Sequence, residues 1–149
     1  LSGDQAIVTA TDVHVARLAQ VQHGAARLGL KSVCTVPIRE DLADLPRGPF
    51  DVILVDAPCS NTGVLQRRPE ARWRLTPGDI AELAELQRRI LSAAVSRLAP
   101  GGRLLYATCS IERAENPQVV AAVRGEFPEL TVVEERTYLP GAGGDGGYQ

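Results

Sequence analysis

Two of the three cysteines in this chain of 149 residues lie in closely similar sequence contexts. Cys59 follows the apolar run VILVDAP, Cys109 follows RLLYAT, and each is followed by a serine. A cysteine thiolate is a strong nucleophile, so thiols at the ends of two buried strands could carry out covalent catalysis. The alternative is that a cysteine only fills space in the core, and we adopt that interpretation for Cys34, which lies inside a predicted strand.

Alternating apolar patterns predict the elements that position these cysteines. Strands are expected over 6–11, 32–36, 50–57, 103–108 and 130–135. Helices are expected over 13–28, from 77 to the glycines after Pro100, and from 117 to about 127. A long polar loop is expected over 61–77. Strands and helices that alternate in this way predict an α/β fold with a doubly wound, mostly parallel sheet.

The polar and thiol side chains of interest follow the predicted strands directly. In open parallel sheets, ligands bind beyond the carboxyl ends of the strands. The residues at or just after such ends are Asp12, Asp56, Cys59, Thr108 and Cys109. We therefore expect one crevice to hold both cysteines, although they are far apart in the sequence.

Composition narrows the function classes. Hydrophobic residues make up 44% of the chain and charged residues 23%, which indicates a packed globular domain. The formal net charge is −2, so any contact with nucleic acid must come from a local basic patch. Three cysteines without a C-x-x-C pair predict neither a metal site nor a disulfide framework. With no leader and no long apolar stretch, we expect a cytoplasmic protein that does not enter membranes.

Several motifs together resemble a known family. The segments DAPCSNTGV, YATCS followed by AEN, and LPGAGGDG look like those of the Sun (Fmu, RsmB) family of RNA cytosine-5 methyltransferases. The stretch TGVLQRRPEARW is most similar to the bacterial branch that modifies small-subunit ribosomal RNA. The resemblance implies a Rossmann-like, S-adenosylmethionine-dependent methyltransferase with RNA, most naturally rRNA, as its partner, and we expect a monomer.

The resemblance also implies roles for the residues near the strand ends. Cys109 would attack carbon 6 of the cytosine, and Cys59 would assist release of the methylated product. Asp56 would hydrogen-bond the base at ring nitrogen 3 and lie beside the cofactor, although an acid there could instead only cap the following turn. Pro58 would shape the base pocket next to the RNA or serve a purely structural purpose.

Two acids are candidates for cofactor binding. Asp12, at the end of a strand, would accept hydrogen bonds from the ribose diol, and Asp41 matches the family position near the adenine. Asp12 could also act as the N-cap of the helix expected from Val13. Glu40 and Asp44 lie close enough to Asp41 to be alternatives to it.

A basic stretch in the predicted loop is the candidate RNA contact. Arg67 and Arg68 would meet phosphates, and Trp73 could stack on a base or simply pack. The alternative is a solvated basic loop. The sequence leaves open whether Glu112, Glu115 or Asn116 reaches the active site or only caps a helix.

The family pattern predicts that residues 1–149 are part of a catalytic domain. The Gly-rich cofactor loop, the first and last strands of the sheet and an N-terminal RNA-binding region are not recognised in the sequence. Alternative functions are a tRNA cytosine-5 methyltransferase of the same family and a non-catalytic RNA-binding remnant. A nucleotide-dependent oxidoreductase is disfavoured because no G-x-G-x-x-G is present and hydride transfer needs no paired cysteines.

Overall fold

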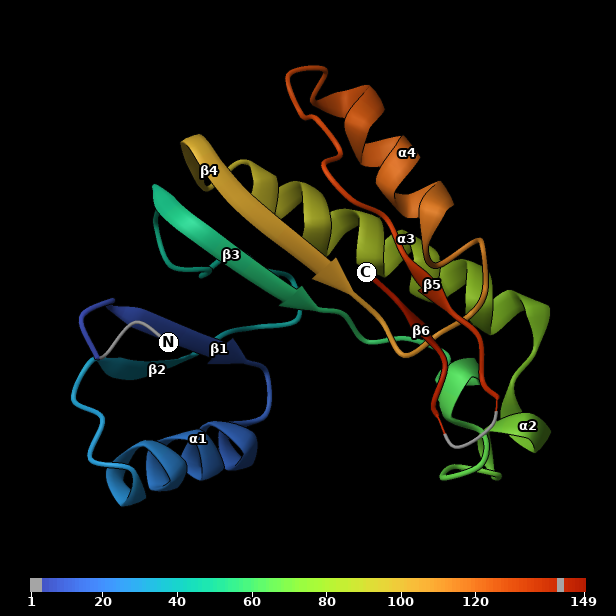
Figure 1. The fold of residues 1–149 in the computed structure, drawn as a ribbon, viewed down its shortest axis with the longest axis horizontal. Coiled ribbons are helices and arrows are strands. Elements are labelled where there is room, and N and C mark those ends of the chain that lie inside the picture. Colours follow the sequence, from blue (N-terminus) through green and yellow to red (C-terminus); the bar gives the residue numbers. More distant parts are fainter. Residues whose placement is uncertain (1–3, 142–143) are drawn as a thin grey trace. The chain divides into compact units, whose positions relative to one another are not determined.

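The computed structural model of the chain describes residues 4–141 and 144–149. The chain divides into two compact units, residues 1–47 and residues 48–149. Each unit contains one pair of parallel strands, and the second unit also carries an antiparallel hairpin near the carboxyl end of the chain (Figure 1). The predicted Asp12 and Asp41 belong to the first unit, whereas the predicted cysteines of the catalytic pair belong to the second.

The first unit is a strand–helix–strand motif. Strand β1 (Val8–Asp12) and strand β2 (Val33–Pro37) pair in parallel, and helix α1 (Val15–Arg27) connects them. The helix ends where Gly29 takes a positive φ of 68°, as its position after the apolar periodicity predicts. Asp12 lies opposite Pro37, so the carboxyl ends of both strands meet at one edge.

Cys34 lies in β2 as expected, but it is exposed, so the prediction that it fills the core is wrong. Its Sγ lies 3.4 Å from Thr9 Oγ1 and 3.5 Å from the Val8 carbonyl oxygen, both on the neighbouring strand β1. Within the first unit, α1 buries Leu18, but Val8 remains 44% exposed. A strand position was correctly predicted here, but the face that the side chain occupies was not.

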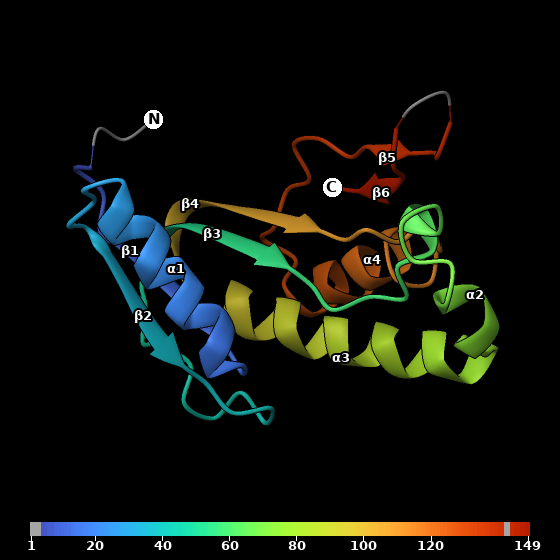
Figure 2. The same cartoon turned by 90° about the horizontal axis from the view of Figure 1, so that it is seen from below.

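The second unit is built on the parallel pair of β3 (Phe50–Asp56) and β4 (Leu98–Ala107). Their register places Asp56 opposite Ala107, so the two chains leave the sheet side by side. Helices α3 (Pro77–Val95) and α4 (Pro117–Glu126) pack on the same face of this pair (Figure 2). Val52 and Leu54 of β3 remain exposed.

Helix α3 begins as its sequence predicts. Thr76 accepts a hydrogen bond from the Asp79 N–H, and the Asp79 carboxylate accepts one from the Thr76 N–H at 2.8 Å, which forms a capping box. Pro77 occupies the first helical turn, where its missing N–H costs nothing. The helix ends at Val95, before the glycines that were expected to end it, because the Arg97 carbonyl already accepts the Phe50 N–H of β3 at 2.9 Å.

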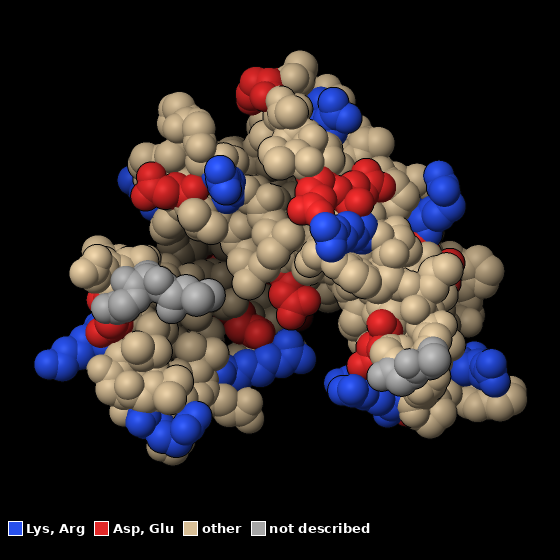
Figure 3. Space-filling view, viewed as in Figure 1, with Lys and Arg blue, Asp and Glu red and all other residues tan. Residues whose placement is uncertain are grey.

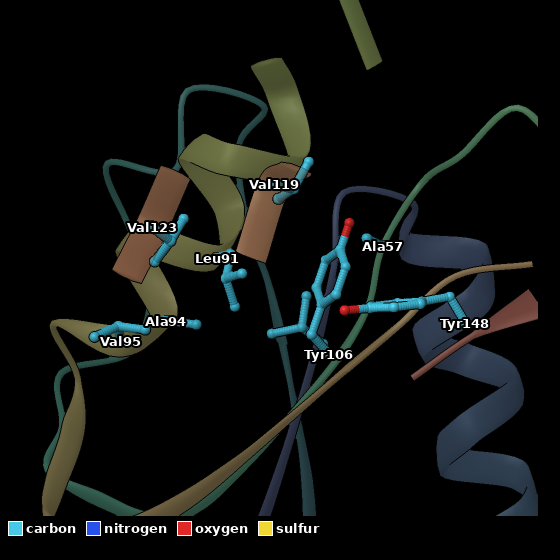
Figure 4. Packing of buried hydrophobic residues seen from close by; sticks show 9 residues of the cluster. Ala57, Leu91, Ala94, Val95, Tyr106, Val119, Val123 and Tyr148 are labelled. Atoms are coloured by element: carbon cyan, nitrogen blue, oxygen red, sulfur yellow. The ribbon is translucent and has the colours of Figure 1, made fainter. Parts of the chain in front are cut away.

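The hydrophobic core of the second unit lies between the sheet and the two helices. Tyr106 of β4 packs edge-on against Tyr148, with ring centroids 6.2 Å apart (Figure 4). The other members of the core come from the end of β3, from α3 and from α4: Val55, Ala57, Leu91, Ala94, Val95, Val119 and Val123. This core fixes the directions in which β3 and β4 enter the following loops.

The segment after α4 departs from the sequence prediction. Residues 130–135 were expected to form a strand, but the structure has none there, and Val133 is 95% exposed. Backbone pairing starts only at Arg136, which exchanges two hydrogen bonds with Gln149. The apolar alternation shows a local preference, but a strand also needs a neighbour for its N–H and C=O groups, and none of the described residues supplies one there.

The strands that do form near the carboxyl end are short. Strand β5 (Thr137–Tyr138) pairs antiparallel with β6 (Gly147–Tyr148). Tyr148 in turn exchanges two hydrogen bonds of 3.0 Å with Thr108, just past the end of β4. The hairpin is thereby attached to the segment that carries Cys109.

The predicted polar loop also contains regular structure. A 3-10 turn, η1 (Thr62–Val64), follows the Cys59 segment, and a short helix, α2 (Ala71–Arg74), precedes α3. Asn61 enters η1 with a left-handed φ of 61°, a conformation that asparagine tolerates well. The prediction of a loop over 61–77 was therefore too simple.

Gly63 in η1 joins three segments through its backbone. Its N–H donates to the Cys109 carbonyl at 2.9 Å, and its carbonyl accepts the Gly146 N–H at 2.7 Å. A Cβ on Gly63 would lie 2.8 Å from the Cys109 carbonyl oxygen and would also collide with the Gly146 carbonyl. Because both neighbours are backbone atoms of hydrogen-bonded segments, only glycine fits here.

We predict that Gly63→Ala destabilises the protein by about 1–3 kcal/mol, because the methyl group forces apart segments that are already hydrogen-bonded. The free energy of unfolding, measured by urea denaturation, tests this. Gly125→Ala is the matched control, since a Cβ on this α4 glycine meets nothing within 4 Å. Equal stabilities of the two variants would contradict the steric account.

Candidate functional site: a pair of cysteines at adjacent strand ends

The structure brings Cys59 and Cys109 together. Their Sγ atoms lie 3.1 Å apart, within hydrogen-bonding contact, and both side chains are half-buried. The contact follows from the sheet, because β3 and β4 are parallel neighbours and the Ala57 N–H still donates to the Ala107 carbonyl at 3.0 Å. The residues that follow the two strands therefore meet at one edge.

Asn61 contacts both cysteines. The Cys109 thiol donates to Asn61 Oδ1 at 3.1 Å, and Asn61 Nδ2 donates to the Cys59 carbonyl at 2.9 Å. The left-handed backbone of Asn61 turns its short side chain back toward the strand ends. The sequence reasoning did not single out Asn61, although its place directly after the Cys-Ser pair was the available signal.

The two thiols have unequal surroundings. Burial raises the pKa of the Cys59 thiol, and its hydrogen bond and electrostatic interaction with Cys109 raise it further. Cys59 therefore keeps its proton at neutral pH. A thiol that keeps its proton is a poor nucleophile, so Cys59 is poorly suited to attack the base.

The serines after the two cysteines also meet. The Oγ atoms of Ser60 and Ser110 lie 3.1 Å apart, and Thr62 Oγ1 lies 3.2 Å from Ser110 Oγ. Both serines are buried, so their hydroxyl groups need partners within the protein. The repeated Cys-Ser sequence thus corresponds to two contacts side by side, sulfur to sulfur and hydroxyl to hydroxyl.

Glu115 is the acceptor at the centre of these hydroxyl groups. Its side chain is fully buried, and its Oε1 accepts the Ser60 N–H at 2.8 Å and Gln87 Nε2 at 2.9 Å. Its Oε2 accepts the hydroxyl groups of Ser60 and, at 2.5 Å, Ser110. A buried carboxylate is tolerated only when hydrogen bonds compensate its lost hydration, and four donors do so here.

Asn116 completes the support of the Cys109 loop. Its Oδ1 accepts the Thr108 hydroxyl at 2.6 Å, and its Nδ2 donates to the Ser110 carbonyl at 2.9 Å. Neither Glu115 nor Asn116 caps α4 through its side chain. Both side chains instead hold the strand-end loops, and the Glu112 backbone N–H donates to the Ser110 hydroxyl.

Asp56 and Pro58 lie on the same segment as Cys59. Asp56 is the last residue of β3 and is exposed, so its carboxylate is available to a ligand. Pro58 is exposed as well, and its carbonyl accepts Gln87 Nε2 at 2.8 Å. The turn after β3 is thus held from the buried side and open on the other.

The predicted RNA-contacting arginines are both exposed, on the segment after η1. Arg67 forms an ion pair with Asp145, with 3.1 Å between Nε and Oδ2, which the sequence reasoning did not anticipate. Among the described residues, no carboxylate lies within ion-pair distance of Arg68. Charges of both signs lie next to one another on the face of this unit shown in Figure 3, so any basic surface there is local.

In the first unit, Asp12 and Asp41 lie at the carboxyl edge of the β1–β2 pair. Burial tends to raise the pKa of Asp12, but the His14 N–H at 2.7 Å and the Arg17 guanidinium outweigh it and lower that pKa. The N-cap of α1 is His14, so the expectation that Asp12 caps the helix is wrong, and Asp12 instead forms a turn with the His14 N–H.

A groove of about 490 Å³ opens at this edge. Its lining residues are Val13, His14, Ile38, Arg39, Glu40 and Asp41. Asp41 accepts the Ala43 N–H at 3.1 Å and pairs with Arg39 at 3.4 Å, whereas Asp44 accepts the Arg39 N–H. Of the acids considered for cofactor binding, Glu40 and Asp41 line this groove, whereas Asp12 and Asp44 do not.

Within residues 4–141 and 144–149, every helix is too short or too polar to span a membrane.

Comparison with known proteins identifies relatives along nearly the whole chain. The chain is 43% identical over 130 residues to ribosomal RNA small subunit methyltransferase B of Klebsiella pneumoniae, and 45% identical over 128 residues to the protein of the same name in Sodalis glossinidius. These matches cover 84% and 85% of this chain, but 29% and 30% of the relatives. The chain thus spans less than a third of the length of these relatives.

Solved structures show the same fold. NSun6 from Pyrococcus horikoshii with SFG superposes with a TM-score of 0.76 at 26% sequence identity, covering 97% of this chain and 40% of that one. A methyltransferase homolog protein from Pyrococcus horikoshii gives a TM-score of 0.76 at 25% identity, covering 97% of this chain and 52% of that one. The prediction of a Rossmann-like methyltransferase fold is therefore confirmed.

The family follows from a match along most of the sequence. A family model described as 16S rRNA methyltransferase RsmB/F matches residues 1–138, a range that includes both strand-end cysteines. The predicted resemblance is confirmed by this match and by the relatives described above. The chain belongs to the RsmB/F family of 16S rRNA methyltransferases.

Proposed function

We propose that the protein methylates carbon 5 of a cytosine in RNA, with small-subunit ribosomal RNA as the substrate, through a covalent cysteine adduct. The observation that carries this proposal is the contact of 3.1 Å between the Cys59 and Cys109 sulfur atoms, in a chain of an rRNA methyltransferase family. Carbon 5 of cytosine is a weak nucleophile, and addition of a thiolate to carbon 6 activates it. Of two thiols at one site, one can form the bond to carbon 6 and the other can assist release of the methylated product.

The raised pKa of Cys59 supports a division of roles between the two thiols. Cys109 is the proposed nucleophile, as the resemblance to the family implies, and the hydrogen bond to Asn61 Oδ1, 3.1 Å away, orients its thiol. Cys59, whose raised pKa keeps it protonated, is the proposed partner in product release. In that step the proton on carbon 5 passes to solvent water and the bond between the Cys109 sulfur and carbon 6 breaks. The departing Cys109 thiolate can accept a hydrogen bond from the protonated Cys59 thiol, whose sulfur lies 3.1 Å away. The aromatic ring and the free enzyme are thereby restored.

Asp56 is the proposed contact to the ring of the base. Its carboxylate is exposed and lies three residues before Cys59 on the turn after β3. A hydrogen bond from this position to ring nitrogen 3 would keep negative charge from accumulating on the ring during thiolate addition. Pro58, exposed between Asp56 and Cys59, is the proposed wall of the base pocket.

The first unit has residues that fit S-adenosylmethionine, which supplies the methyl group when bound. One structural relative is described with SFG, an analogue of this cofactor. Asp12 uses its carboxylate oxygens for His14 and Arg17, but a carboxylate has about four acceptor sites, so it can also accept a ribose diol. Val13 and Ile38 give the neighbouring groove apolar walls for an adenine, and Asp41 provides an acceptor there.

The two cysteines are predicted to be non-equivalent when each is replaced in the full-length protein. Cys59→Ala should permit attack and methyl transfer but stall release, so that enzyme and RNA stay covalently joined. Cys109→Ala should form no adduct and should abolish methylation while RNA binding persists. Denaturing gel electrophoresis after incubation with substrate RNA and S-adenosylmethionine measures the adduct.

Cys34→Ala is the matched control for this experiment, because Cys34 is an exposed thiol in the other unit. It should methylate RNA like the wild type and leave no trapped adduct. An adduct in Cys109→Ala and none in Cys59→Ala would reverse the assigned roles. Full activity in both variants would show that the two cysteines have only a structural role.

The arginines after η1 are predicted to bind RNA phosphates. Replacing Arg67 and Arg68 with alanine should weaken RNA binding and lower the slope of log affinity against log salt by roughly one unit per lost contact. The ion pair of Arg67 with Asp145 does not prevent this role, because exposed ion pairs contribute little free energy and can exchange partners.

Arg124→Ala on α4 controls for the loss of positive charge alone, since it also removes an exposed arginine from the same unit. Its salt dependence should match that of the wild type. If the slope for the double variant equals that of Arg124→Ala, Arg67 and Arg68 do not bind RNA phosphates and are simply solvated surface residues.

A further inference from the structure

Two fully buried polar residues lie behind the cysteine pair without touching either sulfur atom. Gln87 comes from the middle of α3, and Glu115 comes from the segment before α4. Gln87 Nε2 donates both to Glu115 Oε1 at 2.9 Å and to the Pro58 carbonyl at 2.8 Å. Polar side chains seldom occupy the space under a sheet without a specific requirement, because an apolar pair would pack there without needing partners.

Glu115 is held at both its backbone and its side chain. The Tyr106 hydroxyl donates to the Glu115 carbonyl oxygen at 2.7 Å, so the backbone is anchored to β4. The carboxylate then reaches the loop after β3 through Ser60 and the loop after β4 through Ser110. Each of these serines is the direct neighbour of one cysteine of the pair.

We propose that Glu115, fixed by Gln87, is the positioning residue that sets the distance between the two thiols. Its two oxygen atoms act as a single rigid spacer to which both Cys-Ser segments are hydrogen-bonded. Without it, the two Cys-Ser segments would be joined by the neutral side-chain contacts of Ser60, Thr62 and Asn61 and by the backbone bond from Gly63 to Cys109. The importance of this spacing for catalysis rests on the proposed function. The claim that Glu115 sets the spacing rests on the hydrogen bonds alone.

The reach of the side chain, more than its charge, is what the positions of the four donors require. Glu115→Asp keeps the carboxylate but shortens the side chain by one methylene group, so it cannot span both serines. Glu115→Gln keeps the length, and its amide nitrogen would face the hydroxyl groups of Ser60 and Ser110, which can turn to accept it. The aspartate variant should therefore disturb the thiols more than the glutamine variant does.

The ability of the thiols to form a disulfide measures their spacing without any need for activity. The full-length protein carrying Cys34→Ser is equilibrated with oxidised and reduced glutathione. Cys59 and Cys109 lose two protons and two electrons as their sulfur atoms join, and one glutathione disulfide is reduced to two glutathione thiols. The fraction of protein with the internal disulfide, measured by mass spectrometry after alkylation, gives the equilibrium constant.

Glu115→Asp should lower this equilibrium constant about tenfold or more, and Glu115→Gln should lower it less. Glu112→Asp, the same change three residues away on a side chain outside this network, should leave it unchanged. Circular dichroism establishes that each variant is folded. If Glu115→Asp does not fold, Ser110→Ala replaces it, because it removes the hydroxyl group that links the Cys109 loop to the carboxylate.

A folded Glu115→Asp or Ser110→Ala protein with the wild-type equilibrium constant would overturn the inference. In methylation assays, a positioning role further requires that Glu115→Asp lowers kcat while KM for RNA stays unchanged, because Glu115 is buried away from any ligand. Failure of the proposed function would look different. The wild type would then methylate no RNA cytosine, although the disulfide constant would still depend on Glu115.

Discussion

The buried Glu115 carboxylate is the constraint on which the arrangement of the second unit depends. A carboxylate removed from water costs several kcal/mol unless donors surround it, so its surroundings must be built to supply them. Here the donors come from α3 and from the loops after β3 and β4. The requirement to satisfy one buried group thus fixes three separate segments relative to one another, and the cysteines lie on two of them.

Parallel pairing brings these loops to the same edge, and the backbone then locks them together. The register of β3 with β4 places Asp56 opposite Ala107, and the next residues diverge only after one further hydrogen bond. Gly63 closes the arrangement from the other side by joining the Cys109 carbonyl to the carboxyl-terminal hairpin. The thiols therefore occupy a rigid setting with different neighbours, in which burial and the second sulfur atom raise the pKa of one of them.

Much of this could be predicted from the sequence, because helices α1, α3 and α4 and the first four strands follow local periodicity and end signals. The capping box of α3 and the glycine after α1 are examples in which local residues determine the structure. The strand expected over 130–135 was wrong because a strand depends on a distant partner, which periodicity does not reveal. Cys34 was placed in the correct strand but on the wrong face, because exposure depends on what packs against each side.

The candidate site shows the same limit. The positions of Cys59 and Cys109 follow from the rule that parallel strands end at one edge, whereas the Glu115 network does not follow from any local pattern. Its signals were the serine after each cysteine and the acid before α4, but their meeting depends on tertiary packing. The ion pair of Arg67 with Asp145 was missed for the same reason, since the two residues are far apart in the sequence.

The most direct test of the account is the pH dependence of alkylation at each cysteine. Brief treatment with iodoacetamide between about pH 6 and pH 11, followed by peptide mass spectrometry, reports thiolate formation at Cys59 separately from the exposed Cys34. The account predicts that modification of Cys59 rises at clearly higher pH than that of glutathione treated in parallel, and that Cys109→Ser shifts the Cys59 curve to lower pH. A Cys59 curve that coincides with that of glutathione in the wild type would contradict the central claim that partial burial and the contact with Cys109 together hold the proton on Cys59.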